Sequence, residues 1–169
     1  IYTQRDTLSL HDALPISVTD ENGTPRPVEV ETDDEGFVLV TSRDPGFVHG
    51  RQTYVFTYTQ TNVTRYFADT DDDEFFWDTN GTGWYQSFGS VTARVHVPTA
   101  LAASLTGQAA CYRGYEGSTE SCEITTTEEA DGVVLEASVS DLSAFQNMSV
   151  AIGFEPHTFV PRDDSYFGS

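Results

Sequence analysis

Side chains with acid–base chemistry are scattered along this sequence. Of its four histidines, His49 and His157 sit beside turn residues, and His96 lies on the polar side of an alternating valine run. No GxSxG, HExxH or glycine-rich phosphate loop occurs. The chain holds 27 acidic residues, so no two carboxylates stand out as an acid–base pair. The sequence therefore assigns no catalytic residue, and a surface hydrolase is a hypothesis that requires His49 or His157 to meet carboxylates in a cleft.

The two cysteines, Cys111 and Cys122, bracket a polar loop that has two glycines and no apolar run. Strand ends joined by a loop of this size bring two cysteines within bridging distance. A zinc site would need two further ligands, and the sequence has no CxxC, second cysteine pair or HxxxH to supply them. A redox couple is the other alternative. The favoured interpretation is a disulfide in a hairpin, which implies an oxidising compartment.

An acidic loop runs from Asp69 to Glu74, with carboxylates alternating as at the start of a calcium loop. Glu74 occupies the sixth position, where an EF-hand needs glycine, and Asn80 occupies the twelfth, where it needs a bidentate glutamate. A solvated loop on an acidic protein is the simpler interpretation. A looser calcium site is the alternative, and no other cofactor is predicted. Its ligands would be Asp69, Asp71, Asp73 and Asp78.

Three aromatic residues near a DTNGTGW turn form a candidate ligand-binding platform: Trp77, Trp84 and Tyr85. Coplanar exposed rings would stack on a sugar, as in a carbohydrate-binding module. The alternative is that these rings fill the core or pack the turn against it. Phe75 and Trp77 alternate with Phe76, so at least one of these three rings is expected to face outward. Glycosylation patterns begin at three asparagines, although so short a motif arises often by chance: Asn62, Asn80 and Asn147.

Composition excludes several classes of partner. The chain has 169 residues, a formal net charge of −19 and no lysine. Such a charge repels nucleic acid phosphates and disfavours an anionic membrane surface. No run of residues is apolar and long enough to span a membrane. The partner is therefore unknown, and it is predicted not to be nucleic acid.

Short alternating strands separated by turn residues must position these side chains. The segments Gln52–Thr59 and Ser90–Val97 alternate with period two, and Pro98 ends the second. VVLEASVS and MSVAIGF alternate in the same way near the C-terminus. Many short strands without a convincing amphipathic helix predict an antiparallel β-sandwich, immunoglobulin-like or related, in a single domain.

The first 16 residues stand apart from this pattern. IYT and TLSLHDALPI match translated arms of a sequencing adapter, with QRD where a variable index would lie. Residues 1–16 are therefore predicted to be an adapter-derived, non-native segment. The domain is then expected to occupy residues 17–169 as a fragment of a longer protein.

A family resemblance follows from the aromatic positions between Gly50 and Pro98. The pattern is a glycine, an aromatic strand, an aromatic-W-D-x-x-G-x-x-W element and a valine-rich strand ending in proline. It falls on Gly50, Tyr54, Phe56, Tyr58, Trp77, Asp78, Gly81, Trp84 and Val95–Pro98. Over about residues 28–160 the chain resembles DUF2207, a family of predicted bacterial membrane proteins. The resemblance carries over no catalytic residue.

The resemblance implies an extracytoplasmic domain that precedes a transmembrane segment outside this sequence. The chain has arginine but no lysine, a composition that would suit an actinobacterial source. The expected function is that of a membrane-anchored cell-surface domain with a binding or structural role, and its partner would be a cell-wall glycan or a protein. A carbohydrate-binding module and a surface hydrolase are the alternatives.

Overall fold

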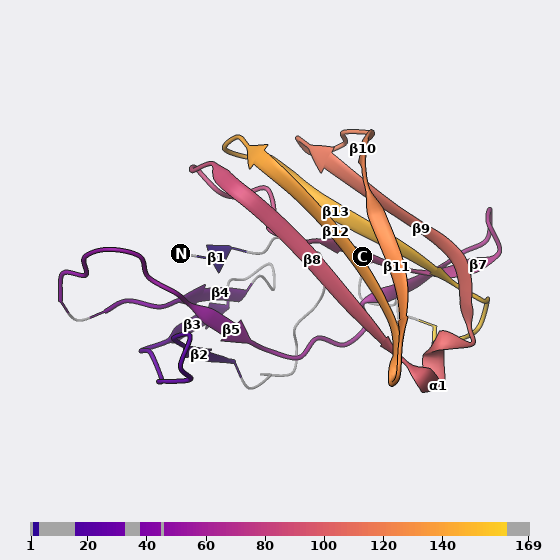
Figure 1. Ribbon diagram of the computed structural model, residues 1–169, viewed down its shortest axis with the longest axis horizontal. Helices are drawn as coiled ribbons and strands as arrows, with labels where there is room; N and C mark the ends of the chain where they lie inside the picture. Colours follow the sequence, from indigo (N-terminus) through magenta and orange to yellow (C-terminus); the bar gives the residue numbers. More distant parts are fainter. Residues whose placement is uncertain (1, 4–15, 33–37, 45, 162–169) are drawn as a thin grey trace. The chain divides into compact units, whose positions relative to one another are not determined.

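The computed structural model describes residues 2–3, 16–32, 38–44 and 46–161 (Figure 1). All its paired strands are antiparallel, so the predicted all-β antiparallel class is confirmed. The only helix in these residues is α1 (Thr99–Ala102). No helix there has the length and apolar character needed to cross a membrane.

The chain divides into two compact units, residues 1–61 and 62–169. The sequence predicted a single domain over residues 17–169, and this division falls inside it. The boundary also cuts the aromatic stretch between Gly50 and Pro98, because the residues around it belong to no strand.

The first unit contains two small sheets. One has three strands in the order β1-β4-β3, and the other pairs β2 with β5. The strands are β1 (Tyr2–Thr3), β2 (Ser17–Thr19), β3 (Glu29–Thr32), β4 (Val38–Thr41) and β5 (Val55–Thr57). The predicted strand Gln52–Thr59 is thus shorter than expected. Most of the predicted adapter-derived segment, residues 4–15, lies outside the described residues, and its origin stays a prediction.

The second unit holds the sandwich. Its larger sheet has five strands in the order β10-β9-β13-β7-β6, and its smaller sheet has three in the order β11-β12-β8 (Figure 1). The strands are β6 (Thr64–Phe67), β7 (Asp72–Asp78), β8 (Phe88–Pro98), β9 (Leu105–Gly114), β10 (Glu120–Cys122), β11 (Ile124–Glu129), β12 (Gly132–Leu142) and β13 (Asn147–Phe154). The chain changes sheet between β7 and β8, β8 and β9, β10 and β11, and β12 and β13.

The core of this unit lies between the two sheets. Alternate residues of β8 and β12 pack against alternate residues of β9 and β13, as the period-two patterns predict. The buried residues of this cluster are Val91, Ala93, Cys111, Ala137, Val139, Leu142, Met148 and Val150. The predicted β-sandwich is therefore confirmed in this unit.

Strand β13 is buried on both of its faces. All eight of its residues are buried, including the polar Asn147 and Ser149. It is the middle strand of the larger sheet, so β9 and β7 flank it on both sides. Its outward-facing side chains therefore need hydrogen-bond partners on the outer face of the sheet.

Candidate functional site

The outer face of the five-stranded sheet carries a row of polar and aromatic side chains. Ser149 on β13 lies opposite Asp78 on β7 and opposite Tyr112 on β9. Phe76 precedes Asp78 by two residues on β7 and lies on the same face, because side chains alternate along a strand. Phe76 is 48% exposed, which confirms the prediction that at least one aromatic of the Phe75–Trp77 trio faces outward.

A groove of about 410 Å³ lies over this row. Its floor includes Phe76, Asp78, Tyr112 and Ser149, and the loop Tyr115–Thr119 between β9 and β10 also lines it. Pockets of this size are typical of sites for small ligands. The groove lies entirely within the second unit.

Neutral hydrogen-bond donors hold the carboxylate of Asp78 in place. Its Oδ1 accepts a hydrogen bond from Asn147 Nδ2 at 2.7 Å and another from the Ser149 hydroxyl. Asn147 Nδ2 also lies 3.2 Å from Ser149 Oγ. None of the hydrogen bonds of the described residues uses Asp78 Oδ2. That oxygen can therefore accept hydrogen bonds from a ligand.

The DTNGTGW turn fixes the end of β7 beside β13. The buried Asn80 accepts from the Met148 N–H through Oδ1 at 3.0 Å and donates to the Gln146 carbonyl through Nδ2 at 3.0 Å. Trp84 Nε1 donates to the Asn80 carbonyl at 2.6 Å. Gly81 takes a φ of 69°, which the turn requires and glycine adopts freely. The turn therefore positions Asp78 at the groove floor.

The three aromatics of the predicted platform have three different environments. Trp77 is half-buried and packs against the core between the sheets. Trp84 packs edge-on against Phe88, with 5.4 Å between ring centroids. Tyr85 is 89% exposed and meets Phe145 edge-on. None of these three residues lines the groove.

The carboxylates of the predicted calcium site are spread along strand β7 and the loop that precedes it. Asp71 accepts a hydrogen bond from the Tyr66 hydroxyl at 2.8 Å, and Asp73 accepts from the Phe159 N–H at 3.0 Å. Asp73 and Asp78 lie five residues apart on β7, on opposite faces and about 16 Å apart along the strand. Asp69 is exposed in the loop. In the described parts of the chain, no three His, Cys, Asp or Glu side chains are grouped to hold a metal ion.

The histidines of the second unit have separate surroundings. His96 Nε2 lies 3.3 Å from the Asp131 carboxylate beside the β11–β12 turn. His157 stacks on Tyr66 and lines a small cavity of about 100 Å³ that also contains Asp73. The Phe159 N–H already occupies Oδ2 of that aspartate.

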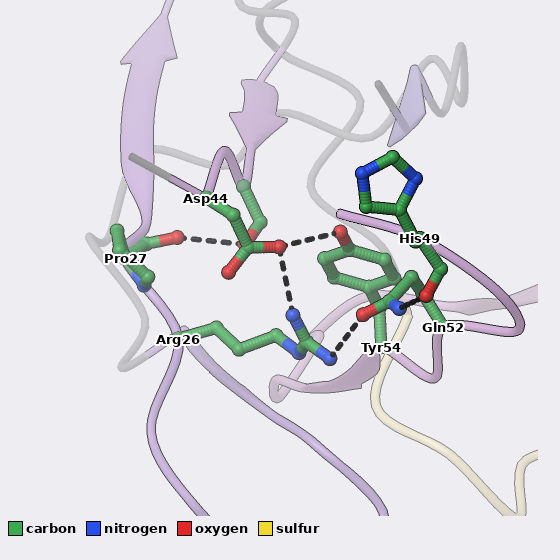
Figure 2. Close-up of polar contacts among 7 residues, drawn as sticks. Arg26, Pro27, Asp44, His49, Gln52 and Tyr54 are labelled. Atoms are coloured by element: carbon green, nitrogen blue, oxygen red, sulfur yellow. Dashed lines mark hydrogen bonds and ion pairs between the residues drawn. The ribbon is translucent and has the colours of Figure 1, made fainter. Parts of the chain in front are cut away.

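A second polar cluster lies in the first unit and surrounds Arg26 (Figure 2). The guanidinium donates to Asp44 Oδ2 at 2.9 Å and lies over the ring of Tyr54, 4.3 Å from its centroid. The Tyr54 hydroxyl donates to the same carboxylate oxygen at 2.9 Å, and Gln52 donates to the His49 carbonyl at 3.0 Å. The hydrogen bond to Asp44 raises the pKa of the Tyr54 phenol, and partial burial adds to the effect. Because these residues belong to separate loops, the cluster cross-links the first unit.

The sequence analysis selected Asp78, as a candidate calcium ligand, but missed most of the other residues that line the groove. Tyr112 and Tyr115 lie within the cysteine loop and its strand, and the outward position of Tyr112 follows from its place beside the inward Cys111. In the sequence, Asn147 and Ser149 stand out only as part of a glycosylation pattern. No sequence signal indicated that both are buried on the outer face of a central strand.

The comparisons with known proteins give one family. The model of the N-terminal domain of a predicted membrane protein family, DUF2207, matches residues 1–154. No curated protein and no solved structure matches the chain. The family match covers most of the chain and agrees with the aromatic pattern around the DTNGTGW turn. The chain therefore belongs to the DUF2207 family of predicted membrane proteins, as an N-terminal domain.

Proposed function

We propose that this chain is the extracytoplasmic binding domain of a membrane-anchored bacterial surface protein, and that its groove binds a cell-wall glycan. The observation that carries the proposal is the groove on the outer face of the five-stranded sheet, which combines exposed aromatic rings with a hydrogen-bonded carboxylate.

The chemistry of the groove supports a sugar ligand. Sugar rings present C–H faces that pack on aromatic rings, and hydroxyl groups that donate to carboxylates. The groove offers rings at Phe76 and Tyr115, which are 48% and 58% exposed, and an unused carboxylate oxygen at Asp78. A small number of placed polar groups within an aromatic lining is typical of sites for small ligands.

Two further features support the location. The disulfide between Cys111 and Cys122 is stable where the surroundings are oxidising, which favours the outside of the cytoplasmic membrane. The family description supports an attachment to the membrane. Basicity from arginine without lysine supports an actinobacterial source.

Binding to purified peptidoglycan and to N-acetylglucosamine oligosaccharides tests the proposal. We expect both to bind the full chain, and we expect Tyr115→Ala to weaken binding about tenfold or more through loss of ring stacking. Tyr85→Ala is the matched control, because Tyr85 is equally aromatic and more exposed but lies outside the groove.

The reverse result would move the site to the platform predicted from the sequence. If Tyr85→Ala abolished binding and Tyr115→Ala did not, the groove proposal would be wrong. If the chain bound neither peptidoglycan nor the oligosaccharides, a structural role would be favoured instead.

A further inference from the structure

The groove carries negative charge, and the guanidinium of Arg113, the cationic residue in its lining, is paired with groups other than Asp78. Asp78 is held by an amide and a hydroxyl, both neutral. Glu116, on the loop between β9 and β10, adds a second carboxylate to the lining. A ligand that brings a positive charge would therefore gain an electrostatic attraction that a neutral ligand lacks.

Arg113 lines the groove but directs its charge elsewhere. It follows Tyr112 on β9, so its side chain projects from the face of the sheet opposite to that of Tyr112. Its Nη2 donates to the Ser140 carbonyl on β12 of the other sheet at 3.1 Å. Its Nε lies 3.7 Å from the Glu120 carboxylate. The guanidinium therefore does not neutralise Asp78.

The aromatic rings beside Asp78 add a second attraction for cations. The face of an aromatic ring carries partial negative charge and attracts an ammonium group. Phe76 precedes Asp78 by two residues on the same face of β7, and Tyr112 lies across β13 from it. An amine placed at Asp78 Oδ2 would thus lie near these rings and make a charge-assisted hydrogen bond.

We infer that the groove prefers glycans with free, protonated amines, such as glucosamine oligomers, over their N-acetylated counterparts. This inference rests on the proposed glycan-binding function and specifies its ligand. Acetylation removes the charge and adds an acetyl group at the nitrogen, so both the hydrogen bond to the carboxylate and the cation–π attraction are weakened.

Calorimetric titration with two oligosaccharides of equal length tests the inference. Tetramers of glucosamine and of N-acetylglucosamine are titrated into the full chain at pH 6, where the amine is protonated. We expect the glucosamine tetramer to bind about tenfold more tightly. Asp78→Asn should reduce this preference to about twofold, because the amide keeps an acceptor for Asn147 and Ser149 but loses the charge.

A control is needed because a chain of net charge −19 attracts any polycation. Asp131→Asn changes the net charge by the same amount at an exposed position outside the groove, and should leave the preference intact. Glu116→Gln, on the exposed loop, is a second groove variant that does not touch the Asp78 network, and it should also lower the preference.

Equal affinity for both tetramers, or tighter binding of the acetylated one, would overturn the inference and leave the glycan proposal standing. If the preference for the glucosamine tetramer survived both groove variants but fell with salt, it would come from the net charge of the chain. The inference would then also be overturned. If neither tetramer binds, the inference fails, and the proposed function fails with it if purified peptidoglycan does not bind either.

Discussion

Cys111 lies directly opposite Cys122 in the β9–β10 hairpin, with 4.9 Å between the two Cα atoms, and the two are joined by a disulfide. Cys111 also lies opposite Val150 on β13, on the inner face of the sheet. The loop that this bridge closes includes Tyr115–Thr119, which lines the groove. The disulfide predicted from the sequence is therefore confirmed, and it links the core to one wall of the candidate site.

Replacing both cysteines by serine should lower the free energy of unfolding by about 2–3 kcal/mol, because the unfolded chain regains the freedom of the closed loop. Denaturant titration of the oxidised protein and the double variant measures the difference. The control is a reducing agent, which should destabilise the original protein and leave the variant unchanged. Equal stability of the two proteins would show that the bridge adds nothing.

The sequence predicted the sandwich well because large apolar side chains alternate along its strands. In β12 and β13, the alternating residues expected to face inward, such as Leu135 and Val150, are buried as predicted. The cysteine pairing could also be predicted, because the chain has two cysteines and a polar loop between two strand ends brings them together. Periodicity reports which face of a strand is apolar, and this information sufficed for the core.

The groove could not be predicted in the same way. It arises where Asp78, Ser149 and Tyr112, far apart in sequence, become neighbours through strand order and register. A period-two pattern places a residue on a face but does not say which strands are adjacent. In the DTNGTGW turn, Trp84 donates a hydrogen bond to the Asn80 carbonyl and so holds the turn together, and the binding platform of Trp77, Trp84 and Tyr85 stays a prediction.

Asn80 is the buried centre of that turn, so Asn80→Ala should destabilise the protein by about 2 kcal/mol. The substitution leaves the Met148 N–H and the Gln146 carbonyl without the partners they have now. Thermal or chemical unfolding checks this expectation. Gln86→Ala is the control, because Gln86 carries the same amide group on an exposed side chain in the same unit, and it should change stability by about 0.5 kcal/mol or less. Similar effects for the two variants would contradict the assigned role.

Gly132 begins β12 where the backbone of β8 passes close by. A Cβ at this position would lie 2.1 Å from the Val97 carbonyl oxygen, and its φ is 153°. Because a backbone atom cannot move aside cheaply, Gly132→Ala should lower the free energy of unfolding by about 2 kcal/mol or more. Gly89→Ala on β8 is the control, since a Cβ there would have no atom within 4 Å. Urea titration of both variants distinguishes them, and comparable stability would show that the strands can separate to fit a methyl group.

Glu74 gives a pH dependence whose sign can be stated. Burial raises the pKa of this carboxyl above its ordinary value of 4.5, and the neighbouring Asp72 raises it further. The folded state therefore binds the Glu74 proton more tightly than the unfolded state does. The stability that this proton contributes is fully present below pH 4.5 and is lost as pH rises through the folded pKa. Glu74→Gln should thus raise the melting temperature at pH 7.

The gain from Glu74→Gln should shrink as pH falls through the raised pKa of folded Glu74, and it should be lost below pH 4.5, where Glu74 is protonated in both the folded and the unfolded state. Melting curves at several pH values measure the difference between the two proteins. Glu128→Gln, at an exposed position on β11, removes the same charge and controls for the net charge of the chain. A gain that does not vary with pH would show that the effect does not come from the ionisation of Glu74.

The Arg26 cluster tests whether the two units unfold separately. The side chains of Arg26 and Asp44 are 13% and 22% exposed, so removing the guanidinium leaves a carboxylate that is poorly hydrated (Figure 2). Arg26→Ala should therefore destabilise the first unit by about 3 kcal/mol. Arg94→Ala is the control, because the Arg94–Glu129 pair is exposed, and breaking it should cost about 1 kcal/mol or less.

Amide hydrogen exchange locates the effect of Arg26→Ala within the chain. Exchange should accelerate in β3 and β4 of the first unit and stay unchanged in β12 of the second, because each unit has its own buried residues. Faster exchange in β12 as well would show that the units unfold together. The division at residues 61 and 62 would then describe geometry and not cooperative folding, and the single domain predicted from the sequence would be the better description of stability.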